Sequence, residues 1–302
     1  MIKEIKKVAI IGPTASGKSD LAIAIAKKMN AYILSIDSLS IYKEIDIVSA
    51  KPSNSELHSV PHFGINALYP NEYFSVDIFI NIYKNVLATC KQENKNLVIV
   101  GGTSFYLKSL IQGLSELPKI NQELSLRVKH EITDLDKAYA LLQKIDPHYM
   151  KNISISDSYR IEKALLIYRA SACAPSDWFT KNPPKSIIKK LSIYNIDVSR
   201  EVLRERIAKR THKMFDLGLV DEVCMLERKY TRLPHAMKSI GIVEVLDYLD
   251  GKYTKEEMLE RISIHTGQLA KRQQTFNKTQ FENITSAPLD DLEEIILGQY
   301  NN

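Results

Sequence analysis

The sequence predicts an α/β protein in which a parallel sheet is flanked by helices and interrupted by an all-helical insertion domain. Three observations support this fold class. Short apolar runs rich in β-branched residues alternate with helical patterns in the first part of the chain. The first of these runs leads into a glycine-containing loop and then a helix. The middle of the chain has helical patterns and no convincing strand.

The alternation covers roughly the first third of the chain. Each apolar run is short and unbroken, as expected for a parallel strand buried on both faces. In order, the predicted elements are strand Lys7–Gly12, helix Gly17–Met29, strand Ala31–Asp37, helix Ser75–Lys91 and strand Leu97–Gly101. Strands joined through helices form parallel pairs, and such sheets bind ligands at the carboxyl ends of their strands.

The second half of the chain supplies the insertion and the return to the sheet. We assign residues 1–118 to the first part of an α/β core, 119–188 to the helical insertion and 189–302 to a second, mostly helical part of the core. Prolines 183 and 184 end the insertion. The next predicted elements are strand Leu191–Val198 and the long helices Arg200–Leu217 and Thr254–Lys278.

Composition excludes several classes of protein. With 302 residues, 44% of them hydrophobic, the chain can bury a sizeable core. Three scattered cysteines indicate reduced thiols rather than a disulfide framework, and the histidines and cysteines lack the spacing of a structural zinc site. The apolar run near the amino terminus is too short for a signal peptide or a membrane span, so we expect a soluble, cytoplasmic protein. A net charge of +5 is only weak support for a nucleic-acid partner.

The first strand is followed by a P-loop, GPTASGKS. It fits the pattern G-x-x-x-x-G-K-[ST], whose backbone N–H groups surround phosphate oxygens at the start of a helix. A strand before it and a helix after it provide the required context, so we predict a P-loop NTPase-like fold. The predicted diphosphate-binding residues are Gly12, Thr14, Ala15, Ser16, Gly17, Lys18 and Ser19. Lys18 adds a positive charge, and the Ser19 hydroxyl is the predicted Mg²⁺ ligand.

The use of the bound phosphate must be inferred from other residues. A motor ATPase or switch GTPase normally has an aspartate at the end of a later strand. Here the third predicted strand ends in Gly101-Gly102-Thr103, which argues against an NTP-hydrolysing switch. Asp37 instead ends the second strand, which we expect to neighbour the P-loop strand. On its position alone, this carboxylate could accept a proton from an acceptor substrate or cap a helix or turn.

The ordered motifs resemble the tRNA dimethylallyltransferase (isopentenyl-tRNA transferase) family over nearly the whole chain. The matching segments are GPTASGKS, SIDSLSIYKEIDIVSAKP (35–52), PHFGI (61–65), GGTSFYLKSLIQGL (101–114), DPHYM and DSYRIEKAL (146–165), RERIAKRTHKMFDLGLVDEV (204–223), SIGIVEV (239–245) and AKRQQTF (270–276). Several positions depart from the family pattern. Ser40 stands where many members have Gln, and Val48-Ser49 replaces Gly-Thr. The remaining departures are Ile242-Val243, Gly267, Leu269 and Phe276.

The resemblance implies a reaction. The family transfers a dimethylallyl group from dimethylallyl diphosphate to N6 of the adenine beside the anticodon, at tRNA position 37, and releases diphosphate. Asp37 matches the family's base, and Thr103 matches a residue near the reacting centre. Arg210 matches an arginine held against the diphosphate; without the resemblance, it would be assigned to a surface ion pair on a charged helix. The implied cofactor is Mg²⁺.

The resemblance also implies the partners. The insertion resembles the part that grips the tRNA anticodon stem-loop, although its helix also fits an amphipathic element that merely exposes its charges. The tRNA-binding residues carried over are Asp37, Ser38, Leu39, Ser40, Thr103, Tyr159, Arg160, Lys163, Lys271, Arg272 and Gln273. No protein partner or membrane is implied, and we expect a monomer.

Three other functions share some of these features. A relative that prenylates free adenine nucleotides would have the same P-loop and aspartate, but the insertion and the AKRQ segment favour tRNA. A small-molecule P-loop kinase would consume ATP. A nucleotide-dependent RNA-binding module would bind tRNA without turnover.

Overall fold

The computed structural model describes residues 4–301 and divides them into two compact units. The first unit contains residues up to Lys108 together with Ile188 onwards, and the second contains Ser109–Ile187. The boundary falls inside helix α4 (Ser104–Gln112). Within the described residues, no helix is both long enough and apolar enough to cross a bilayer.

The first unit is built on a six-stranded sheet in which every pairing is parallel. Its strand order is β3-β2-β4-β1-β5-β6. The strands are β1 (Lys7–Ile11), β2 (Ala31–Ser35), β3 (His62–Phe63), β4 (Asn96–Gly101), β5 (Ser192–Ile196) and β6 (Ile284–Ala287). The predicted parallel sheet is therefore confirmed, and residues 191–198 do return to it.

One predicted neighbour relation is wrong. The sequence places β2 directly after β1, but β4 pairs with both of these strands and lies between them. The register still brings their carboxyl ends together, because Ile11 is opposite Gly101 and Ser35 is opposite Val100. The segments that follow these three strands therefore leave the sheet at one edge.

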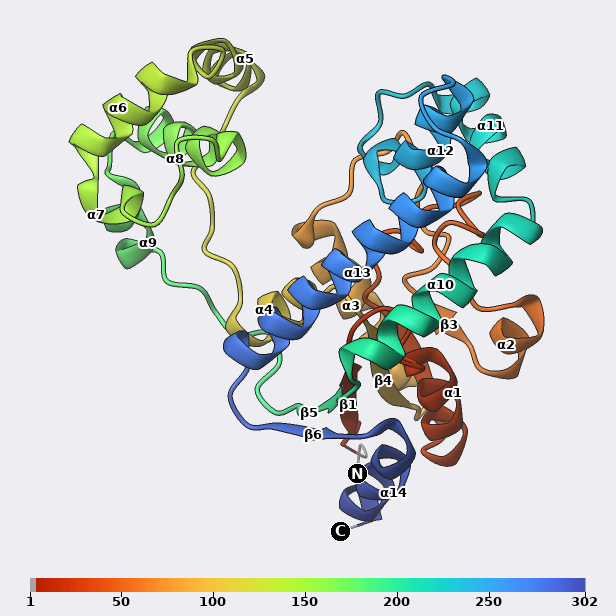
Figure 1. The fold of residues 1–302 in the computed structure, drawn as a ribbon. Coiled ribbons are helices and arrows are strands. Elements are labelled where there is room, and N and C mark those ends of the chain that lie inside the picture. The colour runs from red at the N-terminus through yellow and green to blue at the C-terminus, as the bar shows by residue number, and fades with distance from the viewer. Residues whose placement is uncertain (1–3, 302) are drawn as a thin grey trace. The chain divides into compact units, whose positions relative to one another are not determined.

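Helices cover the sheet and extend the first unit beyond it (Figure 1). They are α1 (Lys18–Lys28), α2 (Asn54–Ser59), α3 (Val76–Gln92), α10 (Arg200–Asp216), α11 (Leu219–Tyr230), α12 (Ile242–Leu249), α13 (Lys255–Gln280) and α14 (Leu289–Asn301), with a short 3₁₀ helix at His235–Lys238. The apolar face of α1 packs with α14 and the sheet, where Ile10, Ile25 and Ile296 are fully buried. A second core joins the segment after β2 to α11, α12 and the start of α13.

The second unit contains only helices among its described elements. They are the end of α4, α5 (Gln122–Glu131), α6 (Leu135–Ile145), α7 (Pro147–Met150), α8 (Ser158–Ser171) and α9 (Pro175–Lys181). Its core includes the fully buried side chains of Val128, Leu142, Ile161 and Leu165. Asp146, almost completely buried, accepts hydrogen bonds from the N–H groups of Tyr149 and Ser176 and so joins α7 to α9.

Candidate active site

The P-loop connects the buried strand β1 to helix α1. Gly17 has φ +89°, a left-handed conformation that costs little only for glycine, and helix α1 begins at the next residue. The Ser16 hydroxyl is buried and has no hydrogen-bond partner among the residues that the structure describes. The loop thus places backbone N–H groups at a helix amino terminus, the usual site for binding phosphate.

Lys18 is folded back onto this loop. Its Nζ donates to the Pro13 carbonyl at 2.6 Å. Burial lowers the pKa of Lys18 to about 8, while nearby Asp37 raises it and Arg210 lowers it further. An anionic ligand would compensate for this desolvation, because it favours the protonated ammonium.

Gln273, on α13, occupies the mouth of the P-loop. Its Oε1 accepts a hydrogen bond from the Thr14 N–H at 2.8 Å. Its Nε2 lies so close to Gly102 that a Cβ there would be only 2.4 Å away. Gln273 is one of the predicted RNA-binding residues, but in the structure its carboxamide lies against the P-loop.

Asp37 begins a tight turn two residues beyond β2. Its Oδ1 accepts hydrogen bonds from the N–H groups of Leu39, at 2.8 Å, and Ser40, at 3.0 Å. Beside this turn, the Thr103 hydroxyl accepts a hydrogen bond from the Ser38 N–H at 3.2 Å. Asp37 therefore caps this turn, one of the two alternatives, and does so through Oδ1. Oδ2 takes no part in the hydrogen bonds of the turn.

Arg210 comes from the second half of α10 and is turned inward, whereas the other arginines and lysines of this helix are exposed. Its Nη1 donates to Thr14 Oγ1 at 3.4 Å. Burial lowers the pKa of Arg210, and Asp37 opposes this shift. The surface ion pair expected without the family resemblance is therefore not the arrangement found, since Lys209, not Arg210, pairs with Glu205.

Two adjoining cavities meet at these residues. Both are lined by Thr14, Asp37, Ser49, Arg210 and Gln273. The smaller, about 90 Å³, is also lined by Lys18, Ser19, Ser40 and residues 50–52. The larger, about 300 Å³, is also lined by Ser38, Leu39, Val48, Thr103, Ile207, Thr211, Met214, Lys238, Ser239, Ile240, Ile262, Thr266 and Leu269. A polar compartment over the P-loop thus opens onto a more apolar one, with Asp37 and Arg210 at the junction.

The smaller cavity suits a magnesium ion that is held mainly by the phosphate groups of a bound ligand. The Ser19 hydroxyl is exposed at the start of α1, and the Asp37 carboxylate lines the same cavity. Among residues 4–301, no cluster of three or more histidine, cysteine or acidic side chains could hold a metal ion. Mg²⁺ is commonly bound by one or two protein oxygens together with phosphate and water, so the residues present fit it.

The other predicted RNA-binding residues lie outside these cavities. Lys271 and Arg272 are exposed and line a groove on α13, and Lys271 also lines a groove between α10 and α13. Tyr159, Arg160 and Lys163 are in the second unit, on α8. There Arg160 pairs with Asp157, and the Lys163 ammonium lies 5.4 Å from the centroid of the Tyr159 ring.

Several cavity-lining residues received no role from the sequence. Lys238, Ser239 and Ile240 precede α12 and line the larger cavity, and Lys51 lines the smaller one. The segment SAKP contains Lys51, SIGIVEV contains Ser239 and Ile240, and Lys238 immediately precedes SIGIVEV. Neither segment has a pattern that predicts a particular chemistry. Only the fold shows that both segments reach the P-loop.

The geometry agrees with the similarity of this chain to known proteins. A model of the family described as IPP transferase matches residues 40–280. The chain is 67% identical over 292 residues to a tRNA dimethylallyltransferase of Sulfurimonas denitrificans, covering 97% of this chain and 98% of the relative. It is 53% identical to that of a Sulfurovum species, covering 98% and 99%.

Solved structures show the same likeness. A tRNA isopentenylpyrophosphate transferase from Bacillus halodurans superposes with a TM-score of 0.72 at 27% identity, covering 99% of this chain and 97% of that one. A eukaryotic dimethylallyltransferase acting on tRNA gives a TM-score of 0.84 at 26% identity, covering 98% of this chain and 77% of that one.

Proposed function

The chain belongs to the IPP transferase family, the family of the tRNA dimethylallyltransferases, and from this premise we propose the roles of its residues in prenyl transfer to tRNA. The donor is dimethylallyl diphosphate, and the acceptor is N6 of the adenine beside the anticodon. The observation that supports this proposal best is the pair of adjoining cavities, because a diphosphate and an apolar group must meet where the acceptor arrives.

The smaller cavity binds the diphosphate. The P-loop N–H groups and Lys18 surround its oxygens, and Arg210 approaches from α10 on the side of Thr14. When bound at Ser19, Mg²⁺ would supply further neutralisation of the diphosphate charge. These groups stabilise negative charge that develops as the bond between the allylic carbon and the diphosphate oxygen breaks.

Asp37 acts on the acceptor. As the N6–carbon bond forms, a proton of the amine passes to Asp37 Oδ2, the oxygen not used in the turn with Leu39 and Ser40. The adenine must leave its stack to reach this position, and a base in a single-stranded loop does so at lower cost than one in a duplex. Thr103 and Ser38 line the cavity where it would arrive.

The remaining RNA contacts are assigned to exposed residues. Tyr159, Arg160 and Lys163 on α8 contact the anticodon stem-loop, and Lys271 and Arg272 on α13 contact phosphates. We also propose that the protein acts as a monomer.

Parallel assays with different acceptors test this function. Purified protein receives Mg²⁺ and dimethylallyl diphosphate with tRNA, AMP or no acceptor, and the release of diphosphate is measured. We expect release with tRNA and little with AMP. Equal release with AMP would indicate a free-nucleotide prenyltransferase. In a parallel reaction that contains labelled ATP instead of dimethylallyl diphosphate, transfer of labelled phosphate would indicate a kinase.

A further inference from the structure

A loop without helix or strand forms one wall of both cavities. We name residues 45–52 the wall loop. Val48 and Ser49 line the larger cavity, and Ser49 to Pro52 line the smaller one. A wall built from turns would be mobile unless its backbone groups were held from outside, because it lacks the hydrogen-bond ladder of a sheet or helix.

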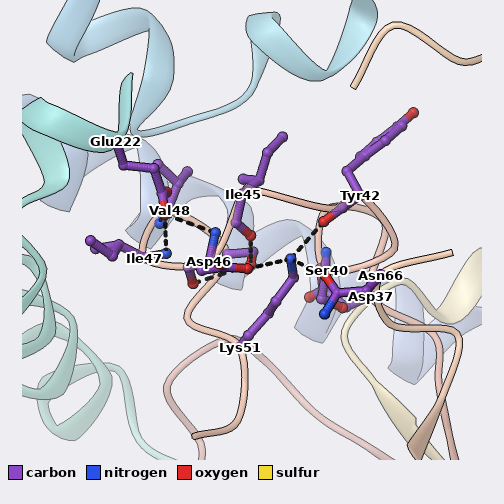
Figure 2. Close-up of polar contacts among 11 residues, drawn as sticks. Asp37, Ser40, Tyr42, Ile45, Asp46, Ile47, Val48, Lys51, Asn66 and Glu222 are labelled. Atoms are coloured by element: carbon purple, nitrogen blue, oxygen red, sulfur yellow. Dashed lines mark hydrogen bonds and ion pairs between the residues drawn. The ribbon is translucent and has the colours of Figure 1, made fainter. Parts of the chain in front are cut away.

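Glu222 holds the beginning of this loop. It lies in the first turn of α11 and is 5% exposed. Its Oε2 accepts hydrogen bonds from the N–H groups of Asp46, at 2.9 Å, and Ile47, at 2.7 Å, and its Oε1 accepts one from Val48 at 2.9 Å. Figure 2 shows one carboxylate facing three consecutive backbone N–H groups.

Lys51 holds the other end. Its Nζ lies 2.6 Å from the Tyr42 carbonyl, 2.7 Å from Asp46 Oδ1 and 2.6 Å from Asn66 Oδ1 (Figure 2). An ammonium has three protons, so these oxygens account for all of them. Although Lys51 lines the diphosphate cavity, its donors are therefore engaged within the protein, and its side chain is only 5% exposed.

The contacts continue to the catalytic turn. The Asn66 N–H donates to the Ser40 carbonyl at 3.1 Å, and the Ser40 N–H donates to Asp37 Oδ1 at 3.0 Å. Hydrogen bonds thus run from Glu222 through the wall loop, Lys51 and Asn66 to Asp37. Every contact in this path joins two groups of the protein, so the path exists without a bound substrate.

We propose that Glu222 and Lys51 are positioning residues of the transfer reaction, which hold the wall loop and the Asp37 turn in the reactive arrangement before substrates bind. This inference rests on the proposed function for the identity of the reaction. It predicts that loosening the wall loop slows transfer while the P-loop still binds diphosphate. A merely structural role would instead lower thermal stability and all activities together.

The substitution Glu222→Gln tests the first contact. The amide has the same size, but its NH₂ group cannot accept a hydrogen bond, so at least one of the three N–H groups loses its acceptor. We expect kcat to fall about 10²-fold, as for a displacement of about 1 Å near the reacting atoms. The affinity for inorganic diphosphate with Mg²⁺, measured by calorimetry, should stay within about threefold, because the P-loop is unchanged.

Asp221→Asn is the matched control. It makes the same carboxylate-to-amide change on the preceding, exposed residue of α11 and should leave both quantities as in the wild type. Hydrogen exchange of Glu222→Gln should show faster exchange of the amides of residues 46–48 and unchanged exchange in the P-loop. A kcat equal to that of Asp221→Asn, or a parallel loss of diphosphate affinity, would overturn the proposal.

A milder variant tests the Lys51 contact even if Glu222→Gln does not fold. Asn66 is exposed at φ +55°, so Asn66→Gly keeps a favourable backbone and removes the side chain whose Oδ1 Lys51 contacts. We expect kcat to fall about tenfold, the effect of losing one hydrogen bond to a charged group. Asn94→Gly, exposed at φ +53° in a remote turn, is the control.

An unchanged kcat for Asn66→Gly would contradict the role of Lys51. Failure of the proposed function gives a different result, because the wild-type protein itself would then release no diphosphate with tRNA. The exchange of residues 46–48 and the binding of inorganic diphosphate remain measurable in that case and still test whether Glu222 holds the loop.

Discussion

The two oxygens of Asp37 have different surroundings, and this difference separates its two roles. Oδ1 accepts two backbone hydrogen bonds that form the turn, whereas Oδ2 is not used there. The sequence placed Asp37 at the rim of the sheet but left open whether it caps a turn or acts as a base. The structure shows that the turn uses Oδ1, and the proposed base is Oδ2.

Asp37→Asn separates these roles. The Asn carbonyl oxygen can still accept from Leu39 and Ser40, so the turn should persist, while the NH₂ group that replaces Oδ2 cannot take a proton. We expect kcat to fall about 10²- to 10⁴-fold, the usual contribution of a general base. Binding of tRNA, measured by filter retention, should be within about threefold of wild type. Near-normal turnover would leave Asp37 only as a turn residue.

Lys18 gives a prediction for pH dependence. Its pKa of about 8 in the free protein means that the ammonium loses its proton as the pH rises through this value. Bound diphosphate favours the protonated form, so binding takes up a proton above pH 8, and affinity should be highest below pH 8 and decrease above it.

Calorimetry with inorganic diphosphate across this pH range measures the effect. We expect Lys18→Met to bind diphosphate more weakly at low pH and to lack the pH dependence that comes from the Lys18 ammonium. The ratio of wild-type to variant affinity therefore separates the effect of Lys18 from the ionisation of diphosphate itself. A ratio that does not change between pH 7 and 10 would contradict this role of Lys18.

At the scale of elements, α13 carries both the exposed Lys271 and Arg272, which we propose as RNA contacts, and Gln273, which contacts the P-loop. Gln273 accepts the Thr14 N–H, an amide that we assign to the diphosphate, so ligand and side chain compete for one donor. Gln273→Ala should therefore bind inorganic diphosphate about 2- to 10-fold more tightly, the net effect of one hydrogen bond.

Gln274→Ala is the control, since Gln274 instead donates to the Val198 carbonyl. Calorimetry at fixed Mg²⁺ compares the two variants. Weaker binding by Gln273→Ala would show that its carboxamide is a ligand of the diphosphate rather than a competitor.

The elements also show what the sequence could predict. Strands β1, β2, β4 and β5 were recognisable because each is a buried apolar run beside a turn or helix. Two edge strands were missed. β3 has only two residues, and β6 (ITSA) has no fully buried residue, so neither has an apolar run long enough to be recognised.

The order of the strands and the Glu222 contacts were not predictable for another reason. Inserting β4 between β1 and β2 depends on tertiary packing, and no local pattern encodes it. Glu222 contacts residues 174 to 176 positions earlier in the chain. In the sequence it is one more acidic residue in the first turn of a helix, a position that acidic side chains often occupy.

At the scale of the whole molecule, each of the two units has a hydrophobic core of its own. Leu165, fully buried in the second unit, tests whether the units are energetically separable. Leu165→Ala should cost about 2–5 kcal/mol of stability. Inorganic diphosphate should still bind, because the P-loop is in the first unit.

Leu126→Ala serves as its control, because Leu126 is 60% exposed in the same unit and should change stability by less than about 0.5 kcal/mol. Thermal unfolding followed by calorimetry reports both quantities. Loss of diphosphate binding in folded Leu165→Ala would show that the two units depend on each other.

We propose that the protein transfers a prenyl group to an adenine of tRNA where the two cavities adjoin. The most direct test of this transfer is mass spectrometry of tRNA after incubation with the protein, Mg²⁺ and dimethylallyl diphosphate, with Asp37→Asn in parallel. We predict a dimethylallyl mass increment on the adenosine beside the anticodon with the wild-type protein and a much smaller one with the variant. Folded wild-type protein that leaves several adenine-containing anticodon loops unmodified would contradict the claim.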